Sequence, residues 1–242
     1  MKKITLLLFL CVSLSTIAKQ PLFTKANIAY ANDSITEAIA LYDSISATGR
    51  ESSELYYILG NCYYKYKNWA NAIWHYEKSL QLNNNEQAKE NLALTKLKII
   101  DRIEALPQLF YKKWWKITQE LLSTKHWQYL AILSIFLALF FGAMNKLLNK
   151  NTKKYYIFFL TIALLLLLII SSSYQNKIDK KEGIIFSSVV AINSAPTANS
   201  TELFTLHSGT KLEITDRIGD WIHIKIANGN SGWILQNSVK EL

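Results

Sequence analysis

The residues of this sequence best suited to chemistry are aromatic rings and carboxamides in a recurring pattern. Two triplets lie 34 residues apart, each with its members at i, i+4 and i+7: Phe23, Asn27 and Tyr30, then Tyr57, Asn61 and Tyr64. This spacing puts the members of a triplet on one stripe of a helix. Aromatic rings and carboxamides on one stripe indicate ligand binding. A second interpretation, in which the rings only pack against neighbouring helices, stays open.

Recognisable catalytic patterns are missing from the sequence. There is no Ser, His and Asp arrangement, no zinc-protease helix motif, no phosphate-binding glycine loop and no recognisable carboxylate pair. We expect His75 and Glu77 to lie on a solvated helix face, His223 to face solvent, and Cys62 to pack as a small apolar residue. The scattered Cys and His residues have no metal-ligand spacing. We therefore expect no enzymatic activity, no cofactor and no bound metal.

The charge balance limits the classes of partner. The 242 residues carry 27 Lys and Arg against 18 Asp and Glu, a formal net charge of +9, and half of them are hydrophobic. The surplus lies beside long apolar runs, where basic side chains attract anionic lipid headgroups. Anionic lipid is therefore an expected partner, and nucleic acid is not.

Three apolar stretches organise the chain. Residues 1–18 have a basic start and an apolar run, as in a secretory signal peptide. Residues 127–148 and 155–174 are long and apolar enough for transmembrane helices, joined by a Lys-rich cytoplasmic loop at 149–154. Because lysines also precede the first span, the signal peptide decides the orientation. Both terminal domains are then expected outside the cytoplasmic membrane.

The segment before the first span has two possible interpretations. Residues 108–122 mix aliphatic and aromatic side chains with Lys112, Lys113 and Lys116. This composition fits a helix that lies in the membrane interface. It equally fits a short connecting helix packed on the preceding domain.

The 34-residue offset extends beyond the two triplets, because Ala26, Ala38 and Tyr42 correspond to Gly60, Ala72 and Tyr76. Residues 53–86 resemble a tetratricopeptide repeat, with these residues at its signature positions: Tyr56, Leu59, Gly60, Tyr63, Ala72, Tyr76 and Ser79. The resemblance predicts close helix packing at Gly60 and Ala72. It implies an α-helical tetratricopeptide solenoid over 19–106, with two repeats, a turn and helix cap at Asn83, Asn84 and Asn85, and a closing helix over 86–106.

In the tetratricopeptide family the concave stripe holds peptide ligands, with Asn side chains bonded to the ligand backbone. The resemblance therefore implies a partner site at the two triplets, with Lys65 beside them: Phe23, Asn27, Tyr30, Tyr57, Asn61, Tyr64 and Lys65.

Past residue 182 the hydrophobic period changes to alternation. Leu212, Ile214 and Ile218 form one run, and Asn228-Gly229 predicts a hairpin turn. The string Gly219-Asp220-Trp221 followed by Gly232-Trp233-Ile234 resembles a bacterial SH3-like domain, which implies a small all-β barrel over 183–242. That family often binds cell-wall peptide or proteins, so Trp221 and Trp233 are candidate contacts. Placement of one of them in the barrel core is an equally good interpretation.

The whole architecture resembles the BatE proteins of aerotolerance (Bat) operons. The predicted multidomain membrane protein runs as follows: 1–18 signal peptide, 19–106 repeats, 107–126 Trp-rich interfacial linker, 127–148 and 155–174 transmembrane helices around the 149–154 loop, 175–182 basic linker, 183–242 SH3-like domain. The resemblance implies a non-enzymatic scaffold that works with von Willebrand A-type membrane proteins and, indirectly, a MoxR-type ATPase. Two alternatives are a peptidoglycan-binding envelope sensor and a periplasmic chaperone.

Overall fold

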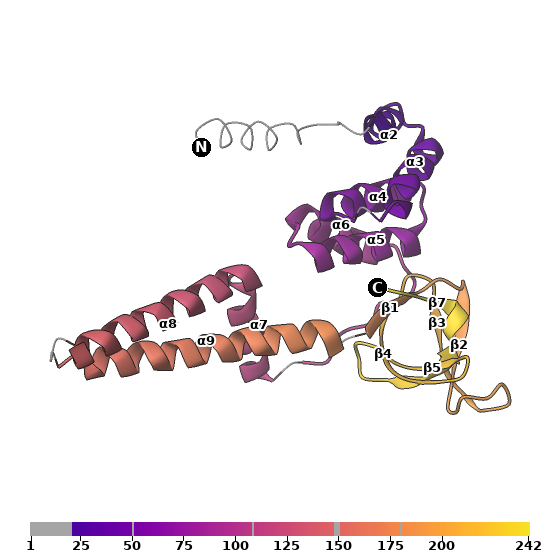
Figure 1. The fold of residues 1–242 in the computed structure, drawn as a ribbon. Helices are drawn as coiled ribbons and strands as arrows, with labels where there is room; N and C mark the ends of the chain where they lie inside the picture. The colour runs from indigo at the N-terminus through magenta and orange to yellow at the C-terminus, as the bar shows by residue number, and fades with distance from the viewer. Residues whose placement is uncertain (1–20, 50, 108, 148–150, 180) are drawn as a thin grey trace. The chain divides into compact units, whose positions relative to one another are not determined.

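The computed structural model describes residues 21–49, 51–107, 109–147, 151–179 and 181–242 (Figure 1). The chain divides into two compact units. Unit 1 comprises the described residues of Met1–Ile103 with Glu182–Ile226 and Asn230–Leu242, and unit 2 comprises those of Glu104–Lys181 with Ala227–Gly229. The predicted signal peptide lies outside the described residues.

The N-terminal part of unit 1 consists of helices in antiparallel succession: α2 (Pro21–Ala31), α3 (Ile35–Ala47), α4 (Ser53–Lys65), α5 (Trp69–Leu82) and α6 (Glu86–Lys96). The side chains of Ser52, Asn68 and Asn85 cap α4, α5 and α6 by accepting from backbone N–H groups. Asn85 thus takes the capping role predicted for its turn. The turns after α2 and α4 contain the left-handed residues Asp33 and Lys67, so their backbone conformation recurs at the 34-residue offset.

Close helix packing at Gly60 is confirmed. A Cβ atom added to Gly60 in α4 would lie 2.5 Å from Cδ1 of Tyr76 in α5, so only glycine fits there without movement. Ala72 is fully buried in the same cluster as Tyr76. Ala26, Tyr42, Leu59 and other residues of α2, α3 and α4 form a second buried cluster.

The closing helix is shorter than the predicted one over 86–106. Helix α6 ends at Lys96, and the chain continues as a nonhelical strap to Ile103. Ile99 of the strap packs against the core of the helical part, and Ile103 packs against the core of the C-terminal sheet. The carboxylate of Asp101 between them accepts hydrogen bonds from the backbone N–H of His207 and the hydroxyl of Thr210. Contacts with both cores and with the C-terminal sheet thus take the place of helical hydrogen bonds in residues 97–103.

The C-terminal part of unit 1 is an antiparallel sheet with strand order β3-β2-β6-β5-β4-β1-β7. Its strands are β1 (Lys181–Ile185), β2 (Val189–Asn193), β3 (Glu202–His207), β4 (Lys211–Ile218), β5 (Trp221–Lys225), β6 (Ser231–Leu235) and β7 (Val239–Glu241). Ile222, Ile224 and Ile234 are fully buried in its core. Gly229 has a φ of 90° between β5 and β6, which confirms the predicted hairpin turn.

One residue of the predicted hydrophobic run in the barrel, Ile218, lies outside the core. Leu212 and Ile214 are buried, but Ile218 is 52% exposed. The pairing of β4 with β5 shifts register between Ile214 and Asp216. A bulge of this kind moves the following residues to the opposite face of a strand, so Ile218 leaves the core.

Unit 2 contains α7 (Phe110–Glu120), α8 (Thr124–Leu147) and α9 (Lys153–Asp179). Lys125–Leu147 and Lys153–Tyr174 are long and apolar enough to cross a membrane, and only 17% and 6% of their most apolar windows are buried. Small residues let α8 and α9 approach: Ala131, Ala138 and Ala163 are buried. Phe141 stacks on Phe159 at a centroid distance of 5.6 Å.

The boundaries around the second apolar helix differ from the predicted ones. Helix α9 begins at Lys153, within the predicted loop 149–154, and continues to Asp179. Strand β1 then begins at Lys181, so the predicted basic linker 175–182 is mostly helix and strand. No Gly or Pro interrupts residues 175–179, so nothing in the chain ends the helix after the apolar run.

Candidate functional site

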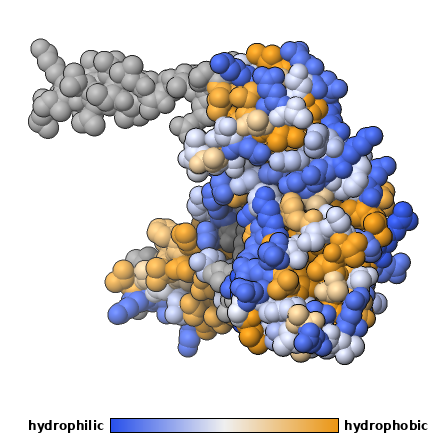
Figure 2. Space-filling model, turned by 90° about the vertical axis from the view of Figure 1, so that its right-hand side faces the viewer, coloured by the Kyte–Doolittle hydropathy of each residue, from blue (hydrophilic) through white to orange (hydrophobic). Residues whose placement is uncertain are grey.

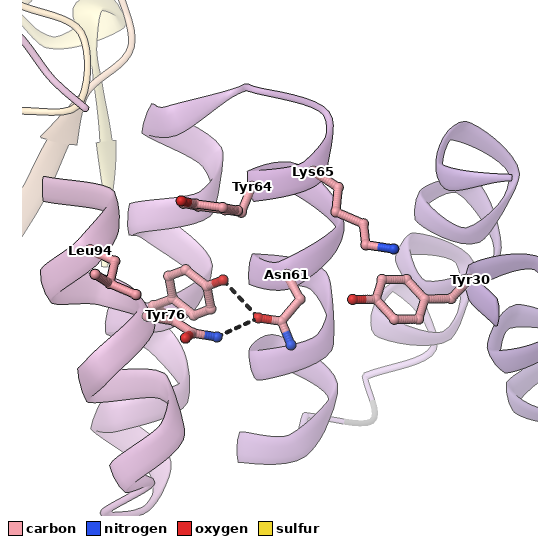
Figure 3. A pocket seen from close by; sticks show the side chains of 7 residues that line it. Tyr30, Asn61, Tyr64, Lys65, Tyr76 and Leu94 are labelled. Carbon is pink, nitrogen blue, oxygen red and sulfur yellow. Dashed lines mark hydrogen bonds between the residues drawn. The ribbon is translucent and has the colours of Figure 1, made fainter. Parts of the chain in front are cut away.

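A groove of about 360 Å³ opens between the helices of unit 1 (Figure 3). Its walls come from four helices: Tyr30 of α2, Asn61, Tyr64 and Lys65 of α4, Tyr76 of α5, and Asn91 and Leu94 of α6. Aromatic rings thus surround a carboxamide at the centre of the groove. This combination of apolar walls with a few polar groups is typical of a ligand site.

Hydrogen bonds fix the orientation of the central carboxamide. The Oδ1 atom of Asn61 accepts from the hydroxyl of Tyr76 at 2.7 Å and from Nδ2 of Asn91 at 2.8 Å. Figure 3 shows the amide nitrogen of Asn61 pointing away from both bonds. In the described part of the chain no hydrogen-bond partner of this nitrogen is found, so its N–H groups are available to an acceptor such as a peptide carbonyl.

The same bond recurs in the preceding helix pair. The hydroxyl of Tyr42 donates to Oδ1 of Asn27 at 2.6 Å, as that of Tyr76 does to Asn61. Each Tyr hydroxyl therefore holds the carboxamide oxygen 15 residues earlier and leaves the amide nitrogen for other contacts. The 34-residue sequence repeat is thus also a repeat of hydrogen-bond geometry.

Lys65 is already engaged in unit 1. Its Nζ atom lies 3.1 Å from Oδ1 of Asp33 and 4.6 Å from the centroid of the Tyr30 ring. The hydrogen bond from Lys65 to Asp33 raises the pKa of the lysine. Lys65 therefore bridges the two helix pairs at the groove edge and keeps its charge there.

The groove contains only part of the predicted partner site. Tyr30, Asn61, Tyr64 and Lys65 line it. Phe23 instead packs edge-on against Tyr42 at 5.8 Å, and Tyr57 packs tilted against Tyr76 at 6.3 Å. Asn27 lies outside the lining residues, although it keeps the bond to Tyr42.

Three lining residues were absent from the predicted site. Tyr76 was assigned to a signature position of the repeat, whereas Asn91 and Leu94 lie in α6, within the predicted closing helix. Leu94 is 54% exposed although it is a large aliphatic residue. Asn91 and Leu94 lie three residues apart near the end of the predicted closing helix. This spacing was the only indication in the sequence that they could line the same site.

A second surface lies on the outer face of the C-terminal sheet. Strand pairing sets His223 of β5 opposite Trp233 of β6, and their ring centroids are 5.0 Å apart. Trp221 lies on the same face of β5, because it is two residues from His223. All three are half-buried, so neither tryptophan belongs to the barrel core. Figure 2, coloured by hydropathy, shows hydrophobic residues among hydrophilic ones on the face of the molecule that it presents.

His75 and Glu77 are not on a solvated face, contrary to the sequence interpretation. Glu77 is 8% exposed because the C-terminal sheet packs over its side of α5, where it pairs with Lys211 of β4. His75 is 4% exposed because its ring stacks on Tyr63 of α4 at a centroid distance of 5.0 Å. The indole nitrogen of Trp74 donates to the backbone oxygen of Glu241 at 2.8 Å, and Nζ of Lys240 lies 3.6 Å from the centroid of the Trp74 ring. This docking could not be inferred from the helix sequence alone.

Burial and charge set the pKa values at this contact. Burial and, to a smaller extent, Lys240 lower the pKa of His75 to about 3, so its ring is neutral. Burial alone would raise the pKa of Glu77, but Lys211 and Lys96 outweigh it and hold that pKa below its usual value. His75 is therefore a neutral imidazole, and Glu77 is a carboxylate whose charge is compensated by two lysines.

The described residues contain no cluster of three or more His, Cys, Asp or Glu side chains that could hold a metal ion. Cys62 is fully buried in α4. Burial raises the pKa of its thiol to about 12, against a smaller lowering by Lys65. The expectation that Cys62 is a packed side chain is thus confirmed.

Comparison with known proteins identifies the C-terminal part of the chain. The family model described as Bacterial SH3 domain matches residues 188–240. These residues cover β2 to β6 and the start of β7, so a bacterial SH3 domain at residues 188–240 is confirmed within the predicted range. No curated protein matches the chain.

Proposed function

We propose that this protein is a non-enzymatic, membrane-anchored adaptor whose helical groove holds an extended segment of a partner protein. In this proposal the helix pairs α2–α3 and α4–α5 are tetratricopeptide repeats. The SH3 domain is a second interaction module, and α8 and α9 anchor both to a membrane. Modules fastened to one anchor bring their partners together at high effective concentration.

The observation that carries the proposal is the orientation of the Asn61 carboxamide. Tyr76 and Asn91 both donate to its oxygen, so the amide nitrogen keeps its hydrogens for a ligand. Packing alone needs no such oriented donor at the centre of a groove. The repetition of the Tyr–Asn bond at Asn27 supports a ligand that runs along more than one helix pair.

The partners we propose follow from the resemblance to Bat-operon proteins. They are von Willebrand A-type membrane proteins, and through them a MoxR-type ATPase, in a complex that responds to oxidative or envelope stress. In this topology both termini lie outside the cytoplasmic membrane. The bacterial SH3 domain and the lysines between the two apolar helices support that orientation.

The test is a crosslinking pull-down from membranes with the full-length chain and an Asn61→Asp variant. The aspartate keeps the Oδ1 acceptor that Tyr76 and Asn91 share, so the fold is retained, but it loses the amide donor and gains a charge. The matched control is Asn32→Asp, which adds the same charge at an exposed turn outside the groove. We expect a discrete set of membrane proteins with the wild type and the control, and its loss with Asn61→Asp.

A second substitution in the groove tests whether any loss of capture in Asn61→Asp comes from the groove or only from the new charge at position 61. Leu94→Lys places a long side chain in the groove, whereas Leu97→Lys changes a leucine that is 62% exposed and does not line it. Only Leu94→Lys should reduce capture. If neither Asn61→Asp nor Leu94→Lys lowers it, the groove is not the docking site. Capture of many unrelated unfolded chains would instead favour a chaperone.

A second candidate function is peptidoglycan binding by the SH3 domain. The observation in its favour is the aromatic outer face formed by Trp221, His223 and Trp233 in the matched domain. Sedimentation of the full chain with purified peptidoglycan tests it. Binding that is lost in Trp233→Ala, and unchanged in Asn61→Asp, would make the SH3 domain the functional centre.

A further inference from the structure

Helix α7 in unit 2 has one strongly apolar stripe. Phe110, Trp114 and Ile117 follow one another at i, i+4 and i+7, and Leu121 continues the stripe just past the helix end. Phe110, Trp114 and Leu121 are 72%, 69% and 68% exposed. Large apolar side chains gathered on one exposed face mark an interaction surface.

The opposite face of α7 is bonded to the two apolar helices. The indole nitrogen of Trp115 and the amide nitrogen of Gln119 both donate to the hydroxyl of Ser172 in α9 at 3.0 Å. The indole nitrogen of Trp127 in α8 donates to the backbone oxygen of Gln119. At about 100° per residue, Trp115 and Gln119 lie on the side of α7 away from Phe110 and Trp114. The apolar stripe therefore faces away from α8 and α9.

These bonds also set the position of α7 along the membrane normal. Ser172 is two residues from the end of the span Lys153–Tyr174, and Trp127 is two residues from the start of the span Lys125–Leu147. Both bonds therefore hold α7 at the same membrane boundary, beside the adjoining ends of α8 and α9 (Figure 1). A helix at this level meets lipid headgroups on any side that protein does not cover.

The positive charge at the start of α7 favours anionic lipid. Lys112 and Lys113 are exposed, and the first turn of the helix contains no acidic residue. The N-terminal end of a helix adds partial positive charge. At about 100° per residue, Lys113 lies next to the apolar stripe, whereas Lys112 lies on the opposite side of the helix. An exposed lysine next to an apolar stripe is complementary to the phosphates and acyl boundary of an anionic leaflet.

We propose that α7 is an interfacial anchor that binds anionic phospholipid. Its stripe of Phe110, Trp114, Ile117 and Leu121 enters the boundary between headgroups and acyl chains, and Lys113 lies at the phosphates. The anchor fixes the end of the α8–α9 hairpin in the membrane plane. This role is independent of the groove in unit 1.

The experiment uses the full-length chain in lipid nanodiscs and a single environment-sensitive fluorophore. Trp114→Cys carries the label on the stripe, and the matched Lys112→Cys carries it on another side of the same turn, both in a Cys11→Ser background. Cys62 does not compete because it is buried. Discs are made of phosphatidylcholine alone or with added phosphatidylglycerol, and some contain a lipid with a quencher on its acyl chain.

We expect the label at position 114 to be quenched by the lipid quencher and shielded from aqueous iodide, and the label at 112 to show the reverse. Because a lysine is worth about fivefold in association with an anionic surface, the variant Lys113→Gln should need more phosphatidylglycerol for the same quenching at 114. Iodide access at 114 equal to that at 112 would overturn the proposal. Shielding at 114 without lipid quenching would also overturn it, because a protein would then cover the stripe.

Discussion

The carboxylate of Glu77 in α5 lies 2.9 Å from Nζ of Lys211 in β4, so an ion pair joins the helical part of unit 1 to its SH3 domain. Glu77 also pairs with Lys96 at 3.0 Å, and Lys211 also pairs with Glu182 at 2.7 Å. The side chain of Glu77 is 11% exposed, so its charge depends on these partners. The helical part and the SH3 domain therefore share one partly buried electrostatic network, with Glu77 as its buried member.

Removal of Lys211 should destabilise unit 1. Lys211→Met leaves the buried Glu77 with only Lys96, and we expect a loss of about 2 kcal/mol in the free energy of unfolding. Urea unfolding of the full chain in mild detergent, followed by hydrogen–deuterium exchange at α5, measures it. The matched control is Lys89→Met, because the pair of Lys89 with Glu86 is about two-thirds exposed. The control should change stability by less than about 0.5 kcal/mol, and an equal effect of both variants would contradict the role of the network.

The stability of unit 1 should fall with acidification below pH 6.5. His75 stays neutral down to about pH 3 in the folded state, whereas an unfolded chain takes up the proton near pH 6.5. The unfolded state thus binds more protons in this window, and stability is lost as pH falls. Between pH 7 and pH 5 we expect a loss of about 2 kcal/mol.

His75→Phe removes the titrating ring and should remove that slope, and His75→Gln serves if the phenyl ring does not fit. Glu77 and Asp101 have lowered pKa values in the folded state. These two carboxylates therefore contribute to stability at every pH above the ordinary pKa of a carboxyl group. That stability is lost only as the pH falls below about 4.5. A slope between pH 7 and pH 5 that persists in both variants would show that His75 is not its origin.

Gly60→Ala should disturb both the core and the groove. The new methyl group would lie 2.5 Å from the Tyr76 ring, which is buried and cannot move freely. We expect about 1 to 3 kcal/mol of destabilisation from overpacking, together with weaker ligand capture, because Tyr76 holds Asn61. Thermal unfolding and the pull-down report the two effects. Ser44→Ala, at an exposed site on α3, should leave both unchanged.

Cys62 should resist alkylation in the folded protein. With its pKa raised to about 12 by burial, almost no thiolate forms at pH 8, and the sulfur has no access to reagent. Mass spectrometry after iodoacetamide treatment should show modification of Cys62 only once urea is added. Rapid labelling without urea would mean that α4 opens readily.

Local periodicity was enough to predict much of this fold. The 34-residue repeat predicted the paired helices and the close approach at Gly60, and two apolar runs predicted α8 and α9. The change to an alternating hydrophobic pattern past residue 182, with the Asn228-Gly229 turn, predicted the barrel strands. These features depend on neighbours within one or two turns or strands, so the chain itself specifies them.

The candidate site was only partly predictable for the same reason. Asn61 and Tyr64 repeat the first triplet, but Asn91 and Leu94 join them only because α6 folds back across α4. Phe23 and Tyr57 have the same spacing as the lining residues, yet tertiary packing turns them onto Tyr42 and Tyr76.

The sequence by itself determined the order of the modules, the repeat and the apolar helices, since all of these follow from composition and short-range spacing. Only the tertiary structure decided that His75 and Glu77 are buried, that the chain from 97 to 103 is a strap, and that Ile218 leaves the core. Each of these outcomes depends on a contact between segments far apart in the sequence, or on a bulge set by strand pairing. Such contacts outweigh local preference because they remove apolar area from water and satisfy buried polar groups.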